Sequence, residues 1–424
     1  MPIKNERALA VAVLTDVLED GAYANIALRK AFAEPEMQEL EPRQRAFATD
    51  LVNETLRNLL RIDHTINSFA KTPVDKMKPF IRNLLRISVC QINHMEKIPS
   101  RAAVNEAVNL TKARGMTNLS GFVNGVLRTI SRSEPESIAS AALKYSYPAW
   151  LYDALTGWLG EPAALDFCEN SHSPPPVIIR TNTIKTSPSH LMSLLEAEGV
   201  KCEPFDDTFL ILRQTGDISK LSPFQEGLFF VMDPGAMQAV HALSPKPGQT
   251  ILDICAAPGG KSFAAACLME NMGTIRAFDI HPHRIELVNQ TRKRLGITSI
   301  TPGIKDVLIH DPSLDESADA VLLDAPCSGF GTIRKHPEIK YTRQPEDIKI
   351  LAEKQRQMLK IAANYVKPGG TLVYCTCTVA TEENMDNIED FLMHHKNYRL
   401  DNAQQILPSP TSDGFFVARL LRSL

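Results

Sequence analysis

A strand, a tight glycine turn and a helix follow one another between residues 251 and 268, and they restrict the fold more than any other feature. This stretch reads ILDICAAPGGKSFAAACL. Its paired glycines let the backbone approach a ligand closely, and the start of the following helix offers unpaired N–H groups. Apolar strands and helices alternate from Asp233 onward, with strands expected at 250–254, 274–278, 319–323 and 371–375. This alternation predicts a doubly wound, largely parallel sheet with helices on both faces, and the terminal DGFFVARLL predicts an antiparallel edge strand.

The first third of the chain has a different pattern. Leu9, Val13 and Val17 repeat every four residues, and similar spacing continues to about residue 132 with prolines between the periodic segments, which predicts successive helices. The segment SEPES (133–137) is typical of a domain boundary. After it, strand-like VIIRTN and FLILR enclose a helical SPSHLMSLLEAEG. We therefore expect a helical domain (1–140), linker helices with a small α/β subdomain (141–232), and the doubly wound domain (233–424).

Charge is concentrated in two stretches, although the 424-residue chain has a net charge of only −3. Residues 61–132 contain 12 Lys/Arg against 4 Asp/Glu, and residues 334–367 contain 9 against 4. Such stretches are typical of a nucleic-acid footprint, and solvated helix faces are the alternative. The eight cysteines have neither disulfide-scaffold nor zinc-site spacing, and no apolar run is long enough to span a membrane. The composition predicts a reducing, cytoplasmic setting with free thiols and no metal.

Three acids mark successive strand ends in the doubly wound domain. Asp279 ends the second strand, Asp306 follows the third and Asp324 ends the fourth. Any one of them would ordinarily be a turn or cap residue, but together they line the edge where ligands bind. The G-x-G-x-x-G pattern of nicotinamide-dependent proteins is absent, and no phosphate-gripping lysine pattern accompanies the turn. S-adenosylmethionine fits these residues, with its ribose at Asp279, its adenine near Asp306 and its carboxylate at the amides of residues 259–261.

Two cysteines lie fifty residues apart and both follow strands. Cys327 comes after the fourth strand and Cys377 after the next, so both should emerge at the same sheet edge. Packing is the alternative role for any free cysteine, and we assign it to Cys375, which lies further inside the strand. Carbon 5 of a pyrimidine accepts a methyl group only after a thiolate has added at carbon 6. The pair therefore indicates pyrimidine carbon-5 methylation, with one thiol attacking and the other assisting elimination.

Polar residues near Cys327 suit the same reaction. Asp324 is placed to hydrogen-bond the edge of the base. A base taken out of its stack also needs cationic contacts to its backbone. The stretch after Cys327 offers Arg334, Lys335, His336 and Lys340 for that purpose.

Three motifs, LDICAAPGGK, DAPCSGFGTIRKHPEI and YCTCTVATEEN, together resemble the RNA cytosine-5 methyltransferases of the NOL1/NOP2/Sun family. The helical first third, with FVNGVLR, resembles the NusB-like RNA-binding domain of a bacterial subgroup, the small-subunit ribosomal RNA methyltransferase B group. This resemblance implies an all-α NusB-like domain, a small RRM-like α/β subdomain and a C-terminal class I (Rossmann-like) methyltransferase domain. The implied substrate is one cytosine of 16S ribosomal RNA, which is cytosine 967 in the family.

The resemblance also implies roles for single residues. Cys377 would be the nucleophile and Cys327 would assist product release. The cofactor contacts would be Cys255, Ala256, Ala257, Pro258, Gly259, Gly260, Lys261, Asp279, Asp306 and Asp324. Many relatives have Thr-Cys-Ser where this chain has Thr376-Cys377-Thr378, and that departure retains a hydroxyl.

Other functions remain open at this stage. A non-catalytic RNA-binding scaffold would rely on the helical domain alone. A dinucleotide oxidoreductase is disfavoured by the missing glycine fingerprint. Transfer RNA is the alternative substrate. The expected partner is small-subunit ribosomal RNA, with no membrane association, and the expected state is a monomer.

Overall fold

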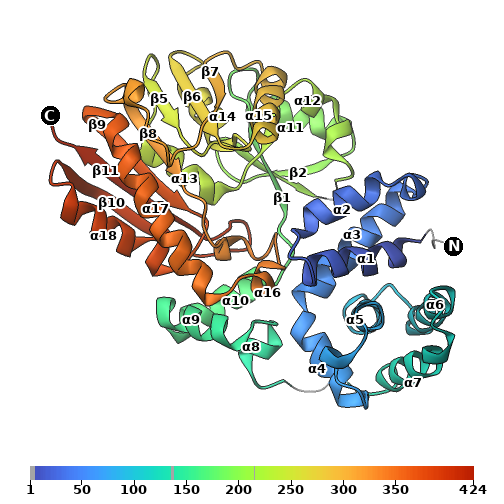
Figure 1. The fold of residues 1–424 in the computed structure, drawn as a ribbon. Coiled ribbons are helices and arrows are strands. Elements are labelled where there is room, and N and C mark those ends of the chain that lie inside the picture. Colours follow the sequence, from blue (N-terminus) through green and yellow to red (C-terminus); the bar gives the residue numbers. More distant parts are fainter. Residues whose placement is uncertain (1–4, 135–137, 214) are drawn as a thin grey trace. The chain divides into compact units, whose positions relative to one another are not determined.

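The computed structural model describes residues 5–134, 138–213 and 215–424, and the chain divides into two compact units (Figure 1). Unit 1 comprises Met1–His172 together with Ile333–Gln344, and unit 2 comprises Ser173–Thr332 and Pro345–Leu424. The segment SEPES lies partly outside the described residues. The three-part division drawn at residues 140 and 232 stays a prediction.

Unit 1 is helical. Its helices are α1 (Glu6–Leu18), α2 (Ala24–Ala33), α3 (Pro42–Arg57), α4 (Leu59–Phe69), α5 (Pro79–His94), α6 (Ser100–Ala113), α7 (Ser120–Ile130), α8 (Ala141–Lys144), α9 (Ala149–Leu159), α10 (Glu161–Ser171) and α16 (Ile339–Thr342). Pro42 and Pro79 occupy the first turns of α3 and α5, where the missing N–H has no intrahelical partner to lose. Leu9, Val13 and Val17 are all buried in the core of the N-terminal helices, as their four-residue spacing predicts.

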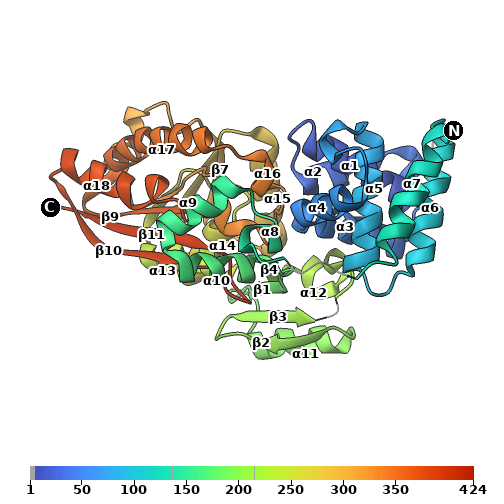
Figure 2. The same cartoon turned by 90° about the horizontal axis from the view of Figure 1, so that it is seen from below.

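Unit 2 begins with a small four-stranded antiparallel sheet of order β2-β3-β1-β4 (Figure 2). Its elements are β1 (Val177–Thr181), α11 (Pro188–Ala197), β2 (Lys201–Pro204), β3 (Phe209–Arg213), α12 (Ser222–Gln225) and β4 (Phe229–Val231). Residues alternate between its two faces. Ile178 and Ile211 pack toward the larger sheet, whereas Ile179 and Leu210 pack on α11. The small sheet is therefore covered on both faces.

A seven-stranded sheet of order β10-β11-β9-β8-β5-β6-β7 forms the rest of unit 2. Its strands are β5 (Thr250–Asp253), β6 (Thr274–Asp279), β7 (Ile300–Ile304), β8 (Ala318–Asp324), β9 (Val366–Thr376), β10 (Tyr398–Ile406) and β11 (Phe415–Arg422). Its helices are α13 (Pro234–Leu243), α14 (Gly260–Leu268), α15 (Pro282–Leu295), α17 (Pro345–Tyr365) and α18 (Met385–His394). Strands β7, β6, β5, β8 and β9 run parallel, as the sequence predicts.

Two apolar clusters cover the two faces of this sheet. Ile251 and Val373 point toward residues of α13 and α14, whereas Leu252 and Leu372 point toward α17 and α18. Adjacent residues of a strand face opposite sides, so an apolar run such as residues 372–374 supplies both layers. Figure 1 shows α17 and α18 lying along the β8–β11 part of the sheet.

The prediction that DGFFVARLL forms an edge strand is half wrong. Strand β11 is antiparallel to β9, but β10 pairs on its other side and takes the edge position. The sequence of β10 mixes polar and apolar residues, and an edge strand with one wet face has no continuous apolar run to reveal it.

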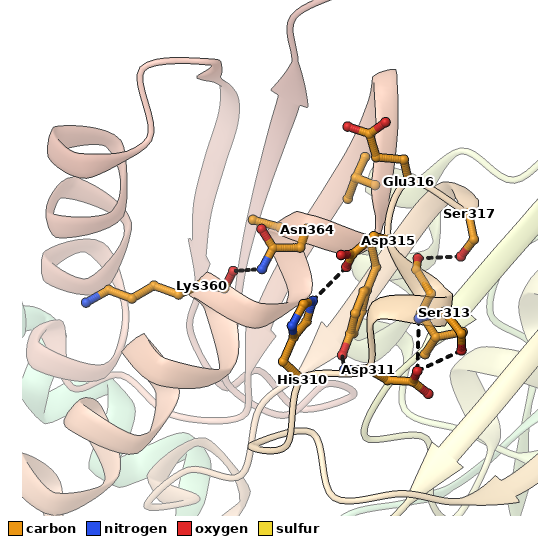
Figure 3. Close-up of polar contacts among 12 residues, drawn as sticks. His310, Asp311, Ser313, Asp315, Glu316, Ser317, Lys360 and Asn364 are labelled. Atoms are coloured by element: carbon orange, nitrogen blue, oxygen red, sulfur yellow. Dashed lines mark hydrogen bonds and ion pairs between the residues drawn. The ribbon is translucent and has the colours of Figure 1, made fainter.

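Local polar contacts stabilise the connection between β7 and β8 (Figure 3). His310 Nε2 lies 2.7 Å from Asp315 Oδ1, and the Ser313 hydroxyl donates to Asp311 Oδ1 at 2.7 Å. The ring of His310 stacks on Tyr365, with centroids 5.8 Å apart. Within the described ranges, no helix combines the length and the apolar character needed to cross a bilayer.

Candidate active site

The glycine turn joins β5 to α14 at the carboxyl edge of the large sheet. Gly259 has a φ of 106°, and a Cβ added there would lie 2.5 Å from the Phe263 ring, so only glycine fits. An added Cβ at Gly260 would meet no heavy atom of the described residues within 4 Å, which leaves open space at the start of α14. The turn and the start of α14 contain Cys255, Ala256, Ala257, Pro258, Gly259, Gly260 and Lys261.

Asp279 and Asp306 follow the next strands along the same edge. Asp279 Oδ1 accepts from the N–H of His281 at 2.9 Å, and Asp306 Oδ1 accepts from the N–H of Leu308 at 2.9 Å. Each carboxylate thus uses one oxygen to accept a hydrogen bond within a local turn, which is the ordinary role of an aspartate at such a position. Asp279 is nevertheless 7% exposed at the strand end, so its carboxylate lies close to the sheet rather than in solvent.

Asp324 forms an ion pair with a lysine from the glycine turn. Lys261 Nζ lies 2.6 Å from Asp324 Oδ2, and the Cys375 thiol lies 3.4 Å from Asp324 Oδ1. Burial is the largest single effect and lowers the pKa of Lys261. The nearby charges, that of Asp324 first, and the hydrogen bond to Asp324 together outweigh it, so the pKa is raised overall. Cys375 is 0% exposed and packs in the sheet core, which confirms the prediction that it is buried.

Cys327 and Cys377 lie side by side. Their Sγ atoms are 3.3 Å apart, within hydrogen-bond distance for sulfur. Parallel pairing of β8 with β9 places Asp324 opposite Cys375, so the residues that follow both strands emerge together. Both thiols are partly exposed and free. The pKa of Cys327 is raised by the hydrogen bond to Cys377, then by burial, then by the charges of Cys377 and Glu383.

The sequence interpretation missed a set of buried polar residues beneath the two cysteine loops. These residues, here called the loop network, are Ser328, Gln355, Tyr374, Thr378 and Glu383, and all are 0% exposed. Glu383 belongs to the motif YCTCTVATEEN, in which two adjacent acids follow the Thr-Cys-Thr segment after three intervening residues. Its position close to the second cysteine was the only sequence signal that could have pointed to Glu383. The neighbouring residues do not distinguish a buried acid from an exposed acid at the start of a helix.

Only part of the basic stretch after Cys327 lies at the surface, although all four of its basic residues were predicted to contact RNA. Arg334 and Lys340 are only 2% and 1% exposed, and their segment belongs to unit 1. Lys340 Nζ donates to the carbonyls of Arg57 and Tyr145 at 2.9 and 3.1 Å. Assigning Arg334 and Lys340 to RNA contact is therefore wrong, because both side chains are buried. Lys335 is exposed.

Unit 1 has a polar pocket of about 470 Å³ between α6 and α7. Its lining residues are Asn105, Val108, Asn109, Lys112, Ser120, Gly121, Asn124 and Arg128. Lys112 and Arg128 belong to the first basic stretch, and three amides accompany them. Cations and amide groups are the side chains that most often contact phosphates and base edges.

Three family models match the chain. Residues 4–132 match the NusB family, residues 147–219 match a ferredoxin-like domain of RsmF/B-like methyltransferases, and residues 240–421 match the 16S rRNA methyltransferase RsmB/F model. These matches and the two sheets confirm the predicted fold class: a NusB-like helical N-terminal domain, a small α/β domain and a C-terminal α/β methyltransferase domain.

Relatives match over nearly the whole length. A probable ribosomal RNA small subunit methyltransferase B of Bacillus subtilis is 36% identical, over 98% of both chains. The ribosomal RNA small subunit methyltransferase B of Shewanella oneidensis is 34% identical, over 99% of both. The crystal structure of PH0851 matches with a TM-score of 0.82 and 29% identity, over 99% of both chains. The chain belongs to the RsmB/F family of 16S rRNA methyltransferases.

Proposed function

We propose that this protein methylates carbon 5 of one cytosine of 16S rRNA through a covalent bond between Cys377 and carbon 6 of the base. Cytosine 967 is the target that the family resemblance suggests. The observation that carries the proposal is the 3.3 Å separation of the Cys327 and Cys377 sulfurs at the same sheet edge as the glycine turn. Two thiols at that place suit a reaction that needs both an attacking sulfur and help in expelling it.

The first step belongs to Cys377. Its thiolate adds to carbon 6, the electrons of the C5=C6 bond move toward N3, and N3 takes up a proton from solvent. Carbon 5 is then part of an enamine and attacks the methyl group, after which N3 releases that proton. Asp324, which is paired with Lys261, is the residue we propose to accept a hydrogen bond from the exocyclic amino group of cytosine.

The glycine turn suits S-adenosylmethionine. When bound, this cofactor supplies an electrophilic methyl group on a sulfonium. The open space at Gly260 and the unpaired N–H groups of the first turn of α14 provide a cradle for its carboxylate. Asp279 and Asp306 each use one oxygen in a turn, and we propose that they meet the ribose and the adenine through the other. The residues from Cys255 to Lys261 form the floor of this site.

Cys327 serves the last step. The proton on carbon 5 passes to water, the electron pair of that C–H bond restores C5=C6, and the bond between carbon 6 and sulfur breaks with its pair leaving on Cys377. The raised pKa of Cys327 keeps its proton in place, so its S–H group can donate to the departing thiolate. This division of roles explains why two thiols are needed, because one must be free to attack and the other must hold a hydrogen-bond donor.

The decisive experiment incubates the protein with 16S rRNA and S-adenosylmethionine, followed by denaturing gels and a methylation assay. We expect Cys377→Ala to lose activity by more than about a thousandfold and to form no covalent RNA adduct. Cys327→Ala should accumulate the adduct, because release of the methylated base is slowed. Cys202→Ala, which removes a partly exposed thiol of the small sheet, is the matched control.

A reversed pattern would overturn the roles. If Cys377→Ala still methylates while Cys327→Ala is simply inactive, the nucleophile is Cys327. If the wild-type protein binds rRNA without methylating any cytosine, the chain is an RNA-binding scaffold. Methylation of tRNA in preference to rRNA would replace the substrate and leave the chemistry intact.

A further inference from the structure

The proposed reaction assigns no role to the loop network beneath the cysteines. A carboxylate that is fully removed from solvent is costly unless hydrogen bonds satisfy it. Glu383 is 0% exposed, and it follows Cys377 by only six residues in the chain. A buried acid so close to two reactive thiols calls for a specific function rather than a contribution to the apolar core.

Glu383 holds the loop that carries Cys327 from both sides of that cysteine. Its Oε2 accepts from the backbone N–H of Ser328 at 2.9 Å and from Gln355 Nε2 at 2.8 Å. Gln355 Nε2 also donates to the carbonyl of Pro326 at 2.9 Å. The residues immediately before and after Cys327 are therefore both tied to the same carboxylate, one directly and one through the amide of Gln355.

The same network reaches the loop that carries Cys377. The hydroxyls of Ser328 and Thr378 are 2.7 Å apart, so the residues that follow the two cysteines are hydrogen-bonded to each other. The Tyr374 hydroxyl donates to the Glu383 carbonyl at 2.6 Å and lies 3.1 Å from Gln355 Oε1. Strand β9, helix α17 and the Cys327 loop thus contact Glu383, and the Cys377 loop joins the same network through Ser328.

We propose that Glu383 is a positioning residue that holds the Cys327 thiol against Cys377, and that release of methylated RNA depends on it. The inference rests on the proposed function. The negative charge of Glu383 adds a second effect, because it favours the protonated form of Cys327 that donates to the leaving sulfur. Attack by Cys377 and methyl transfer need no help from Cys327, so loosening its loop should slow the last step selectively.

Three variants test this role. Glu383→Met keeps the length of the side chain and removes both acceptor oxygens. Glu383→Gln keeps one oxygen that can accept from Ser328 and Gln355. Gln355→Met leaves residue 383 as glutamate and removes the amide that donates to both the Pro326 carbonyl and Glu383 Oε2. Glu389→Gln changes an exposed acid of helix α18, which begins two residues after Glu383, and is the matched control.

We expect Glu383→Met to complete the first methyl transfer within about threefold of the wild-type rate, and to accumulate covalent RNA adduct and lose multiple-turnover rate by roughly tenfold. Glu383→Gln should recover most of the turnover. Gln355→Met should show the same defect more weakly, and combining it with Glu383→Met should add little, since both act on one loop. A chain that has lost its fold forms no adduct, so adduct accumulation cannot arise from unfolding.

Other outcomes would overturn the inference. An unchanged adduct fraction in Glu383→Met, or equal losses in the first and later turnovers, would reduce Glu383 to a structural residue. If Glu383→Met shows no cooperative thermal unfolding, Gln355→Met alone decides in the same way. If Cys327→Ala also fails to accumulate adduct, the proposed function itself is at fault and not only the role of Glu383.

Discussion

Lys340 places its side-chain amine in the interior of unit 1, where Nζ donates to two backbone carbonyls and lies 4.8 Å from the centroid of the Tyr147 ring. Burial and the neighbouring charge of Arg57 hold its pKa well below the usual value for lysine. Between that lowered value and about 10.4, the unfolded chain binds a proton that the folded chain does not. Over this pH range the free energy of unfolding therefore increases as the pH rises, and the increase is lost as the pH falls toward the lowered pKa of Lys340.

Lys340→Met removes the titrating group and tests this linkage. We expect the free energy of unfolding of the wild type, relative to the variant, to increase between pH 7 and 9.5 by up to about 1.4 kcal/mol per pH unit. Urea unfolding of both proteins at several pH values measures the difference. A difference that stays flat with pH would mean that Lys340 is charged in the folded protein. Lys335→Met, which changes the exposed lysine of the same segment, is the control.

At the scale of elements, the loops after β8, β9 and β10 meet with almost no space between them. The N–H of Gly331 donates to the carbonyl of Cys377 at 2.9 Å, and the N–H of Gly414 donates to the carbonyl of Gly331 at 2.9 Å. A Cβ added at Gly331 would lie 2.1 Å from the Gly414 oxygen. Only a residue without a side chain allows this approach, so the glycine sets how close the two cysteine loops lie.

Gly331→Ala should push these loops apart. We expect a loss of about 1–3 kcal/mol in the free energy of unfolding. The methylation rate of the folded protein should also fall, because the Cys377 carbonyl is one of the displaced atoms. Thermal unfolding and rRNA methylation assays measure the two effects. Gly157→Ala in α9, where an added Cβ meets no heavy atom of the described residues within 4 Å, should leave both unchanged.

At the scale of the whole molecule, the chain leaves unit 2 after Thr332, contributes residues 333–344 to unit 1, and returns at Pro345. Unit 1 is therefore built from two separate stretches of the chain, and the second comes from within the methyltransferase family match. Buried contacts such as the one from Arg57 to the Arg334 carbonyl, 2.9 Å, join the two stretches. The helical unit thus includes residues 333–344, which are distant in sequence from α1 to α10.

RNA binding by unit 1 gives a prediction for the intact protein. If the pocket between α6 and α7 contacts the phosphate backbone, replacing Lys112 and Arg128 with alanine should weaken rRNA binding. The slope of log affinity against log salt should become shallower by nearly two, and affinity for S-adenosylmethionine should not change. Filter binding over a range of salt concentrations measures the slope. Lys246→Ala, at an exposed lysine of unit 2, is the control, and an unchanged slope in the double variant would remove the pocket from the RNA surface.

Local pattern predicted the order of the strands, turns and helices in the methyltransferase domain apart from β10, because strand and helix periodicities are properties of neighbouring residues. It also placed Cys327, Cys377, Asp279 and Asp324 at one sheet edge, since parallel strands share their carboxyl end. The local pattern could not predict that Arg334, Lys340 and Glu383 are buried. Whether a charged side chain meets water or a carbonyl depends on segments that are distant in sequence, and only their packing brings the hydrogen-bond partners of these three residues into place.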